Sequence, residues 1–186
     1  QSLAAIAATG AVPVVTWEPM YYRQADGAEV ILPEAVIRDG RYDAYLDACA
    51  TLFAAQPGRV IVRLMHEPNL SRYHWGVARD AYGPEAPAVY QRIWRHIVGR
   101  VRRTTASAPD RVQFAFCANA ESVPGPGNAA HAGWNTITAY YPGAAWVDLV
   151  GVDGYNWGDT QTPARHGWQS SWRSFESVLG PAVAEL

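Results

Sequence analysis

The stretch Arg59-Val-Ile-Val-Arg-Leu-Met-His66 decides the fold, because it is short, rich in β-branched residues and nearly continuously apolar. This pattern predicts a parallel strand that is covered on both faces. Three further stretches share the pattern, namely residues 11–18, 111–117 and 146–153. Residues 42–55 and 87–104 lie between these stretches and carry apolar side chains at helical spacing. We therefore expect alternating strands and helices, which is an α/β protein built on a parallel sheet.

Polar and aromatic side chains gather at or directly after the carboxyl end of each expected strand. They are Trp17-Glu18, His66-Glu67, residues 119–121 and Asp153-Gly-Tyr155. A doubly wound sheet and a barrel both fit the element order, but no G-x-G-x-x-G phosphate loop follows any strand. Functional residues at the carboxyl ends of the strands are typical of a barrel. A closed barrel takes about 250 residues and eight strands. We therefore predict a (β/α)8 TIM barrel that is incomplete in this chain, with about four βα units.

The composition of the 186 residues narrows the function classes. A formal net charge of −2 gives no reason to expect nucleic acid or a membrane as partner. Two cysteines do not make a disulfide framework, and no metal or other cofactor is expected. Eight Trp and ten Tyr stand against four Phe. This excess fits either a surface that stacks against sugar rings or an ordinary core, and composition alone leaves both open.

The motif Arg63-Leu-Met-His-Glu-Pro-Asn69 carries the densest chemical signal. Alternate strand residues share a face, so Arg63, Met65 and Glu67 are expected to point into the barrel. A carboxyl group at the strand end can protonate a departing glycosidic oxygen. On this interpretation His66 donates to substrate or to a second carboxylate, and Asn69 holds a sugar hydroxyl. The alternative is a structural ion pair between Arg63 and Glu67.

The last expected strand ends in Val147-Asp-Leu-Val-Gly-Val-Asp-Gly-Tyr155. Asp153 and Tyr155 have the same strand parity, so both can face the mouth of the barrel. A tyrosine hydroxyl in that place can hold a nucleophilic carboxylate, and Trp157 follows as a stacking platform for a sugar. The alternative is a capping Asp153 and a core Tyr155.

Three more residues are candidates for substrate binding. Glu18 is expected to accept a sugar hydroxyl and Trp17 to offer a ring platform, although both also fit rim packing. Trp75 lies on a long expected loop, where a large aromatic side chain indicates a binding partner. Trp168 carries no functional prediction.

These motifs resemble glycoside hydrolase family 26. The resemblance rests on Arg63-Leu-Met-His-Glu-Pro-Asn69 with Trp75, on Tyr141-Pro-Gly143 followed by residues 147–155, and on Val14-Val-Thr-Trp-Glu-Pro19. It implies a (β/α)8 barrel and retaining, endo-acting cleavage of β-mannan, most simply β-1,4-mannan, or of a related β-glucan or β-xylan. By the same resemblance Glu67 is the acid/base after the fourth strand, Tyr155 lies beside the nucleophile, and the protein is secreted.

One departure from the family pattern concerns the nucleophile. The family has a Glu that ends the seventh strand, in a stretch such as Ala-Glu-Phe-Gly, and nothing here matches it. The nearest candidate, Glu185, lies in residues 175–186, which have helical spacing. We therefore expect residues 1–186 to be the central part of one catalytic barrel, covering strands three to six. The nucleophile would then follow residue 186.

An incomplete barrel is expected to be neither active nor well folded by itself. A chain with one of the two carboxylates should be inactive alone, and open strand edges should make it fold poorly alone. The alternative function is a non-catalytic carbohydrate-binding barrel or pseudoenzyme with the same aromatic residues. The sequence predicts neither the oligomeric state nor the particular polysaccharide.

Overall fold

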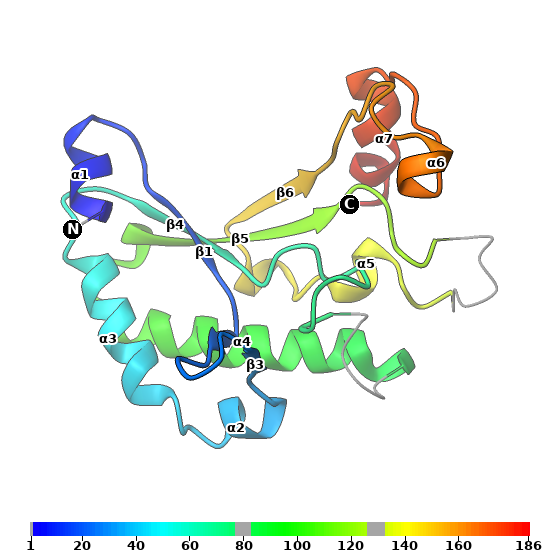
Figure 1. The fold of residues 1–186 in the computed structure, drawn as a ribbon. Coiled ribbons are helices and arrows are strands. Elements are labelled where there is room, and N and C mark those ends of the chain that lie inside the picture. Colours follow the sequence, from blue (N-terminus) through cyan, green and yellow to red (C-terminus); the bar gives the residue numbers. More distant parts are fainter. Residues whose placement is uncertain (1, 77–82, 126–132) are drawn as a thin grey trace.

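The computed structural model describes residues 2–76, 83–125 and 133–186, and its centre is a four-stranded parallel sheet (Figure 1). The strand order is β1-β4-β5-β6. The strands are β1 (Val14–Trp17), β4 (Val60–Leu64), β5 (Val112–Asn119) and β6 (Leu149–Asp153). All four predicted strands are confirmed. Within the described residues the sheet is open: β1 and β6 are its edges, and the barrel is not closed.

Side chains of β4 show how the sheet separates its two faces. Val60, Val62 and Leu64 are buried, whereas Ile61 and Arg63 between them are partly exposed. The buried set packs under helices α3 (Asp43–Ala54) and α4 (Ala86–Thr104), which lie together on one side of the sheet (Figure 1). The other face is only half covered, so the expectation of strands covered on both faces is wrong for the described residues.

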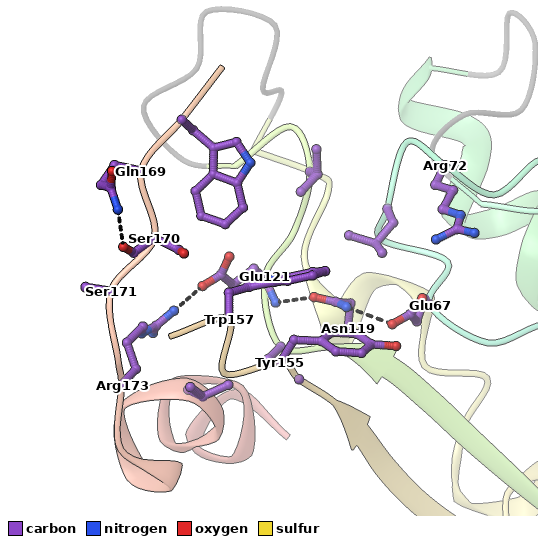
Figure 2. A pocket seen from close by; sticks show the side chains of 16 residues that line it. Glu67, Arg72, Asn119, Glu121, Tyr155, Trp157, Gln169, Ser170, Ser171 and Arg173 are labelled. Atoms are coloured by element: carbon purple, nitrogen blue, oxygen red, sulfur yellow. Dashed lines mark hydrogen bonds and ion pairs between the residues drawn. The ribbon is translucent and has the colours of Figure 1, made fainter. Parts of the chain in front are cut away.

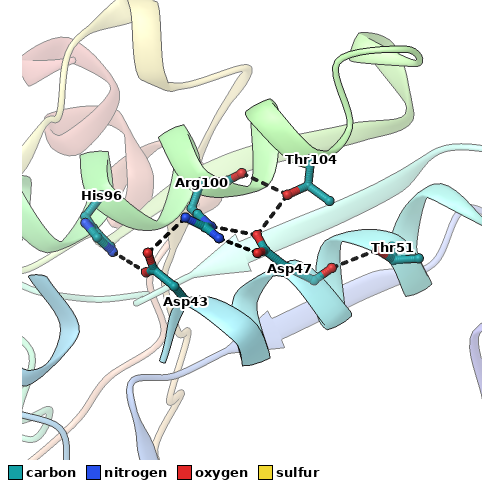
Figure 3. A network of polar contacts seen from close by, with 6 residues as sticks. All are labelled: Asp43, Asp47, Thr51, His96, Arg100 and Thr104. Carbon is teal, nitrogen blue, oxygen red and sulfur yellow. Dashed lines mark hydrogen bonds and ion pairs between the residues drawn. The ribbon is translucent and has the colours of Figure 1, made fainter. Parts of the chain in front are cut away.

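The two long helices are held together by apolar and polar contacts. Ile93 and Ile97 of α4 are buried at the spacing that the sequence predicts. On the outside, Arg100 binds Asp43 at 3.0 Å and also pairs with Asp47, and the guanidinium lowers the pKa of Asp47 to about 2 (Figure 3). These ion pairs fix the helix layer that supports β4 and β5.

Shorter elements surround the sheet. An antiparallel hairpin follows β1 and consists of β2 (Met20–Tyr22) and β3 (Glu29–Ile31). The remaining elements are α1 (Ser2–Ala8), α2 (Glu34–Arg38), η1 (Gly83–Glu85), η2 (Pro109–Arg111), α5 (Ile137–Tyr140), η3 (Ala144–Trp146), α6 (Pro163–His166) and α7 (Phe175–Glu185). None of the described helices is both long and apolar enough to span a membrane.

Helix α7 confirms the helical pattern expected near the end of the chain. Glu185 lies in its last turn, where the carboxylate accepts a hydrogen bond from the backbone N–H of Thr138 at 3.0 Å. Val178 and Ala182 are buried, but Phe175 and Val183 of the same expected apolar face are exposed. The sequence therefore predicted the helix correctly and overestimated how much of it the described residues cover.

Candidate active site

Glu67 lies three residues beyond β4, where the backbone leaves the sheet. Met65 and Glu67 have φ angles of 45° and 50°, a left-handed conformation that non-glycine residues rarely adopt. The Glu67 N–H donates to the Cys117 carbonyl of β5 at 2.7 Å, which holds the bend. Because extended geometry ends at Leu64, strand alternation stops there. Met65 is consequently buried in the core, and its expected place beside Arg63 and Glu67 is wrong.

The Glu67 carboxyl group is buried to 4% exposure and still lines a cleft of 590 Å³ (Figure 2). That volume falls in the usual range for ligand sites, roughly 300–1,000 Å³. Asn119, at the end of β5, donates its side-chain N–H to Glu67 Oε1 at 2.7 Å. Burial and, after it, the negative charge of Glu67 raise the pKa of Tyr73. The Asn119 hydrogen bond thus holds the carboxyl group in one position where it lines the cleft.

Asn69 and Asn119 are joined by reciprocal hydrogen bonds, which fix the position of the Asn119 side chain beside Glu67. Asn69 donates to the Asn119 carbonyl at 2.9 Å, and the Asn119 backbone N–H donates to Asn69 Oδ1 at 3.0 Å. The Asn119 side-chain oxygen accepts the Glu121 N–H at 2.9 Å. Asn69 is completely buried, and both ends of its amide are used. The prediction that Asn69 holds a sugar hydroxyl is therefore wrong, and Asn69 instead positions Asn119.

Arg63 has a different carboxylate partner from the one that the sequence suggested. Its guanidinium binds Asp153 at 2.8 Å, across the intervening strand β5. The alternative ion pair between Arg63 and Glu67 is not among the salt bridges of the described residues. The structure thus brings Arg63 and Asp153 together at the carboxyl edge of the sheet, where both remain partly exposed.

His66 is a buried imidazole beside the cleft. Its ring packs against Tyr73 and Trp75, with centroids 4.6 and 5.5 Å away. Burial first, and then the Arg63 cation, lower the pKa of His66 to about 4, so the ring is neutral at pH 7. Within the described part of the chain its Nδ1 atom has no hydrogen-bond partner, and the nearest carboxylate oxygen is Glu18 Oε1 at 3.9 Å.

Trp17 ends β1 and Glu18 follows it directly, and the two side chains have different neighbours. Glu18 approaches His66, and burial, followed by the negative charge of Glu29, raises the pKa of Glu18. Trp17 pairs in register with Leu64, whose side chain lies under the helix layer. Its ring meets Phe53 of α3 edge to face at a centroid distance of 5.6 Å. The expected ring platform at Trp17 is therefore wrong, because strand alternation turns the indole away from the cleft.

Trp75 is also a supporting residue and not a platform. It is 1% exposed, stacks on Tyr73 with centroids 4.8 Å apart, and donates its indole N–H to the His66 carbonyl at 2.7 Å. The loop that carries it folds back under the site, so the expectation of an exposed binding aromatic is wrong. The contacts of Trp75 fix the backbone and the ring of His66 in position.

Tyr155 and Trp157 line the same cleft as Glu67, as their predicted roles require. The two rings stack with centroids 5.5 Å apart and planes 28° apart. Other lining residues received no individual role from the sequence: Arg72, Asn119, Glu121, Trp168 and Arg173. Asn119 and Glu121 belong to the stretch 119–121, which the sequence did place at a strand end, and Asn119 is the last residue of β5. Trp168 is far from every strand motif in the sequence, and only the folding of its loop brings it to the cleft.

The described residues contain no group of three or more His, Cys, Asp or Glu side chains that could hold a metal ion. The chemistry that this arrangement offers is that of one fixed carboxyl group, a neutral imidazole, an ion pair and exposed aromatic rings. Together with the parallel sheet, these features define an open cleft with one fixed carboxyl group at the carboxyl edge of an α/β fold.

Comparison with known proteins identifies the family. The sequence model of glycosyl hydrolase family 26 matches residues 39–170, and the chain belongs to this family. The resemblance predicted from the motifs is thereby confirmed. Endoglucanase H of Acetivibrio thermocellus is 30% identical over 177 residues, which are 95% of this chain and 17% of that protein.

Solved structures show the same fold. Bacillus subtilis mannanase BCman matches with a TM-score of 0.59 and 18% identity, covering 83% of this chain and 46% of the mannanase. Bacillus subtilis mannanase man26 matches with the same TM-score, 20% identity and the same coverages. The chain therefore spans less than half of these mannanases and a small part of endoglucanase H.

Proposed function

We propose that residues 1–186 are the central part of a (β/α)8-barrel glycoside hydrolase that cuts β-linked polysaccharides internally, with Glu67 as acid/base. One observation carries the proposal: the Glu67 carboxyl group is held by Asn119 at 2.7 Å and lines a cleft that also presents Tyr155 and Trp157. A fixed carboxyl group beside exposed aromatic rings suits a sugar chain that must be gripped and protonated at one oxygen. Membership of family 26 supports this chemistry.

The proposed reaction is a retaining double displacement. Glu67 gives its proton to the glycosidic oxygen while a second carboxylate attacks the anomeric carbon and the old C–O bond breaks. Glu67 then takes a proton from water, whose oxygen attacks the same carbon and releases the second carboxylate. Retention requires the two carboxyl groups to be about 5–5.5 Å apart. We propose that the second carboxylate belongs to sequence outside these residues, since the chain covers 46% of mannanase BCman.

Four neighbouring side chains are proposed to assist the two carboxyl groups. His66 is neutral at pH 7, because burial and Arg63 lower its pKa, so it can donate through Nδ1 to the second carboxylate or to a sugar hydroxyl. Tyr155 is proposed to donate its hydroxyl to the same carboxylate. Asp153 is proposed to bind substrate while Arg63 holds it in place at 2.8 Å. Glu18 is proposed to accept a sugar hydroxyl at the rim.

Two substrate classes are proposed, in order. β-1,4-Mannan comes first on the motif resemblance, and the structures with the same fold are mannanases, although at 18–20% identity this likeness concerns the fold. A β-glucan comes second, because the relative with 30% identity is named endoglucanase H. Release of reducing ends from mannan, mixed-linkage glucan and xylan by the full-length protein decides between them. Because such polymers do not cross membranes, we also propose that the protein acts outside the cell.

The test of the acid/base role is Glu67→Gln in the full-length protein. Loss of the proton donor should lower turnover on polymer by about 10²–10⁴-fold. Glycosides with an activated aryl leaving group need no proton to depart, so they should still be cleaved in a first rapid burst. Azide should then speed the second step, because it replaces the water that Glu67 activates.

The matched control is Glu185→Gln, which changes a carboxylate on α7 that accepts a hydrogen bond from Thr138 and does not line the Glu67 cleft. Its turnover should stay near that of the unaltered protein. Near-normal turnover of Glu67→Gln would remove the proposed role. A full-length protein that binds oligosaccharides without cleaving any of them would instead favour the non-catalytic carbohydrate-binding alternative.

A further inference from the structure

Tyr90 is a buried residue of α4 that contacts the bend before Glu67 from the helix side of the sheet. Its hydroxyl donates a hydrogen bond to the backbone carbonyl of Met65 at 3.0 Å. Burial raises the pKa of Tyr90 well above its usual value of 10, so the hydroxyl keeps its proton and acts as the donor. Because both Tyr90 and Met65 are completely buried, solvent does not compete for this hydrogen bond.

The bend itself has a backbone conformation that needs support. The left-handed φ angles of Met65 and Glu67 are unfavourable for residues with a side chain, and such angles persist only where the surrounding structure holds them. The two N–H groups of these residues are bound to neighbouring strands, that of Met65 to the Trp17 carbonyl at 2.9 Å and that of Glu67 to the Cys117 carbonyl at 2.7 Å. The Tyr90 hydroxyl adds a hydrogen bond from the helix layer to the Met65 carbonyl.

The ring of Tyr90 is packed among other aromatic rings, so its hydroxyl has a defined position. Tyr140 and Phe116 meet the ring edge to face, with centroids 5.6 and 6.3 Å away. Trp94, one turn further along α4, lies at a centroid distance of 5.9 Å. A side chain that is close-packed on several sides cannot follow a carbonyl that moves. Helix α4 therefore fixes, through Tyr90, the place of the Met65 carbonyl.

We infer that Tyr90 is a positioning residue for the acid/base: by holding the Met65 carbonyl it maintains the bend that directs the Glu67 carboxyl group into the cleft. The inference rests on the proposed function of Glu67. Tyr90 does not line the cleft, so its hydroxyl is assigned no contact with substrate. Loss of the hydroxyl should change the orientation of the acid and leave the substrate-binding surface as it is. The effect should therefore fall on kcat and not on KM.

The experiment uses Tyr90→Phe in the full-length protein, which removes the hydroxyl and keeps the ring. On the preferred polymer kcat should fall roughly tenfold while KM stays within about twofold, since a shift of about 1 Å in a reacting group costs up to about a hundredfold. The first turnover on an activated aryl glycoside should stay within about twofold, because that leaving group needs no proton. A smaller folded fraction would instead lower both activities by the same factor. Unchanged kcat on polymer overturns the inference.

The matched control is Trp94→Phe. Trp94 is also completely buried in α4, and its indole N–H donates to the Trp146 carbonyl at 3.1 Å, just before β6 at the amino edge of the sheet. This variant loses one buried donor of the same helix and leaves a carbonyl without it, but at the opposite edge of the sheet from Glu67. Urea denaturation should show lower stability in both variants, whereas kcat should fall in Tyr90→Phe only. An equal fall of kcat in Trp94→Phe overturns the inference.

A double-mutant cycle separates this inference from the proposed reaction. Tyr90→Phe is added to Glu67→Gln, and turnover on polymer is compared with that of Glu67→Gln alone. If Tyr90 acts only through the Glu67 carboxyl group, the added change should cost less than about twofold. A further tenfold loss would overturn the positioning role and leave that of Glu67 intact, whereas near-normal turnover of Glu67→Gln alone would remove the proposed function.

A crystal structure of the unaltered full-length protein gives a second measurement that does not depend on the folding of any variant. Positive φ angles at Met65 and Glu67, with the Tyr90 hydroxyl about 3 Å from the Met65 carbonyl oxygen, support the inference. A Met65 residue with negative φ, or a Tyr90 hydroxyl more than about 3.5 Å from that oxygen, overturns it.

Discussion

The buried imidazole of His66 should make the stability of the protein depend on pH in a defined window. Burial, with help from Arg63 and Arg72, lowers the pKa of His66 to about 4, while Asp153 acts in the opposite direction. Glu18 Oε1 lies 3.9 Å from Nδ1, too far for a hydrogen bond. In the unfolded chain the same ring has an ordinary pKa of about 6.5. As the pH falls below 6.5, the unfolded state takes up a proton and the folded state does not.

The direction and the size of the pH effect on stability follow from the difference between the pKa values of His66 in the folded and unfolded states. The stabilising contribution is complete above pH 6.5 and is lost progressively as the pH falls toward 4. The difference between a pKa of about 6.5 in the unfolded chain and about 4 in the folded protein corresponds to roughly 3 kcal/mol at full loss and about 2 kcal/mol at pH 5. Urea denaturation of the full-length protein at pH 7, 6 and 5 measures it, with His66→Asn as the non-titrating comparison. The contributions of carboxylates that titrate in both proteins cancel when the stability of His66→Asn is subtracted from that of the unaltered protein at each pH.

The unaltered protein should lose about 1–3 kcal/mol more than His66→Asn between pH 7 and pH 5. A second readout does not depend on the variant's folding: the NMR signal of the His66 ring in the unaltered protein should not titrate between pH 7 and pH 5. Parallel stability curves, or a His66 signal with a midpoint near 6.5, would refute the reasoning.

Three further predictions concern residues that support the site, all in the full-length protein. Asn119→Ala removes the 2.7 Å donor to Glu67, so kcat should fall roughly tenfold with little change in KM; a rise in KM alone would contradict a positioning role. Trp75→Ala should lower the free energy of unfolding by about 3–5 kcal/mol in urea, since the ring is buried; normal stability with a raised KM would instead make it a sugar platform. Gly76→Ala would place a Cβ atom 1.8 Å from the Pro68 carbonyl oxygen, so unfolding should become easier by roughly 3 kcal/mol; a thermal melt that matches the unaltered protein would disprove this steric limit.

Several features were predictable because they depend on neighbouring residues in the sequence. Continuous β-branched runs predicted all four strands of the sheet, and helical spacing placed Glu185 on α7. Strand ends in a parallel sheet meet at one edge, so the sequence also predicted that residues around Glu67 and Tyr155 would share a cleft. Each of these conclusions needs only a local pattern and a general rule of parallel sheets.

Burial of the individual aromatic residues was not predictable in the same way. The sequence treated Trp17, Trp75 and Trp157 as similar candidates, and one of the three lines the cleft. Trp17 faces α3 because of its register with β4, and Trp75 is buried because its loop folds back under His66. Trp168 had no prediction and lines the cleft. An indole looks alike in a core and in a binding surface until its neighbours are known.

The sequence alone determined which residues form the parallel strands, the family to which the chain belongs, and the place of Glu67 just beyond a strand end. Only the tertiary structure decided the partners of that carboxylate. The left-handed backbone at Met65 and Glu67 breaks strand alternation, and Asn119 reaches Glu67 from a strand about fifty residues away. Local periodicity contains no information about such contacts, because packing between distant segments, and not the order of residues along one strand, sets the distance between the two side chains.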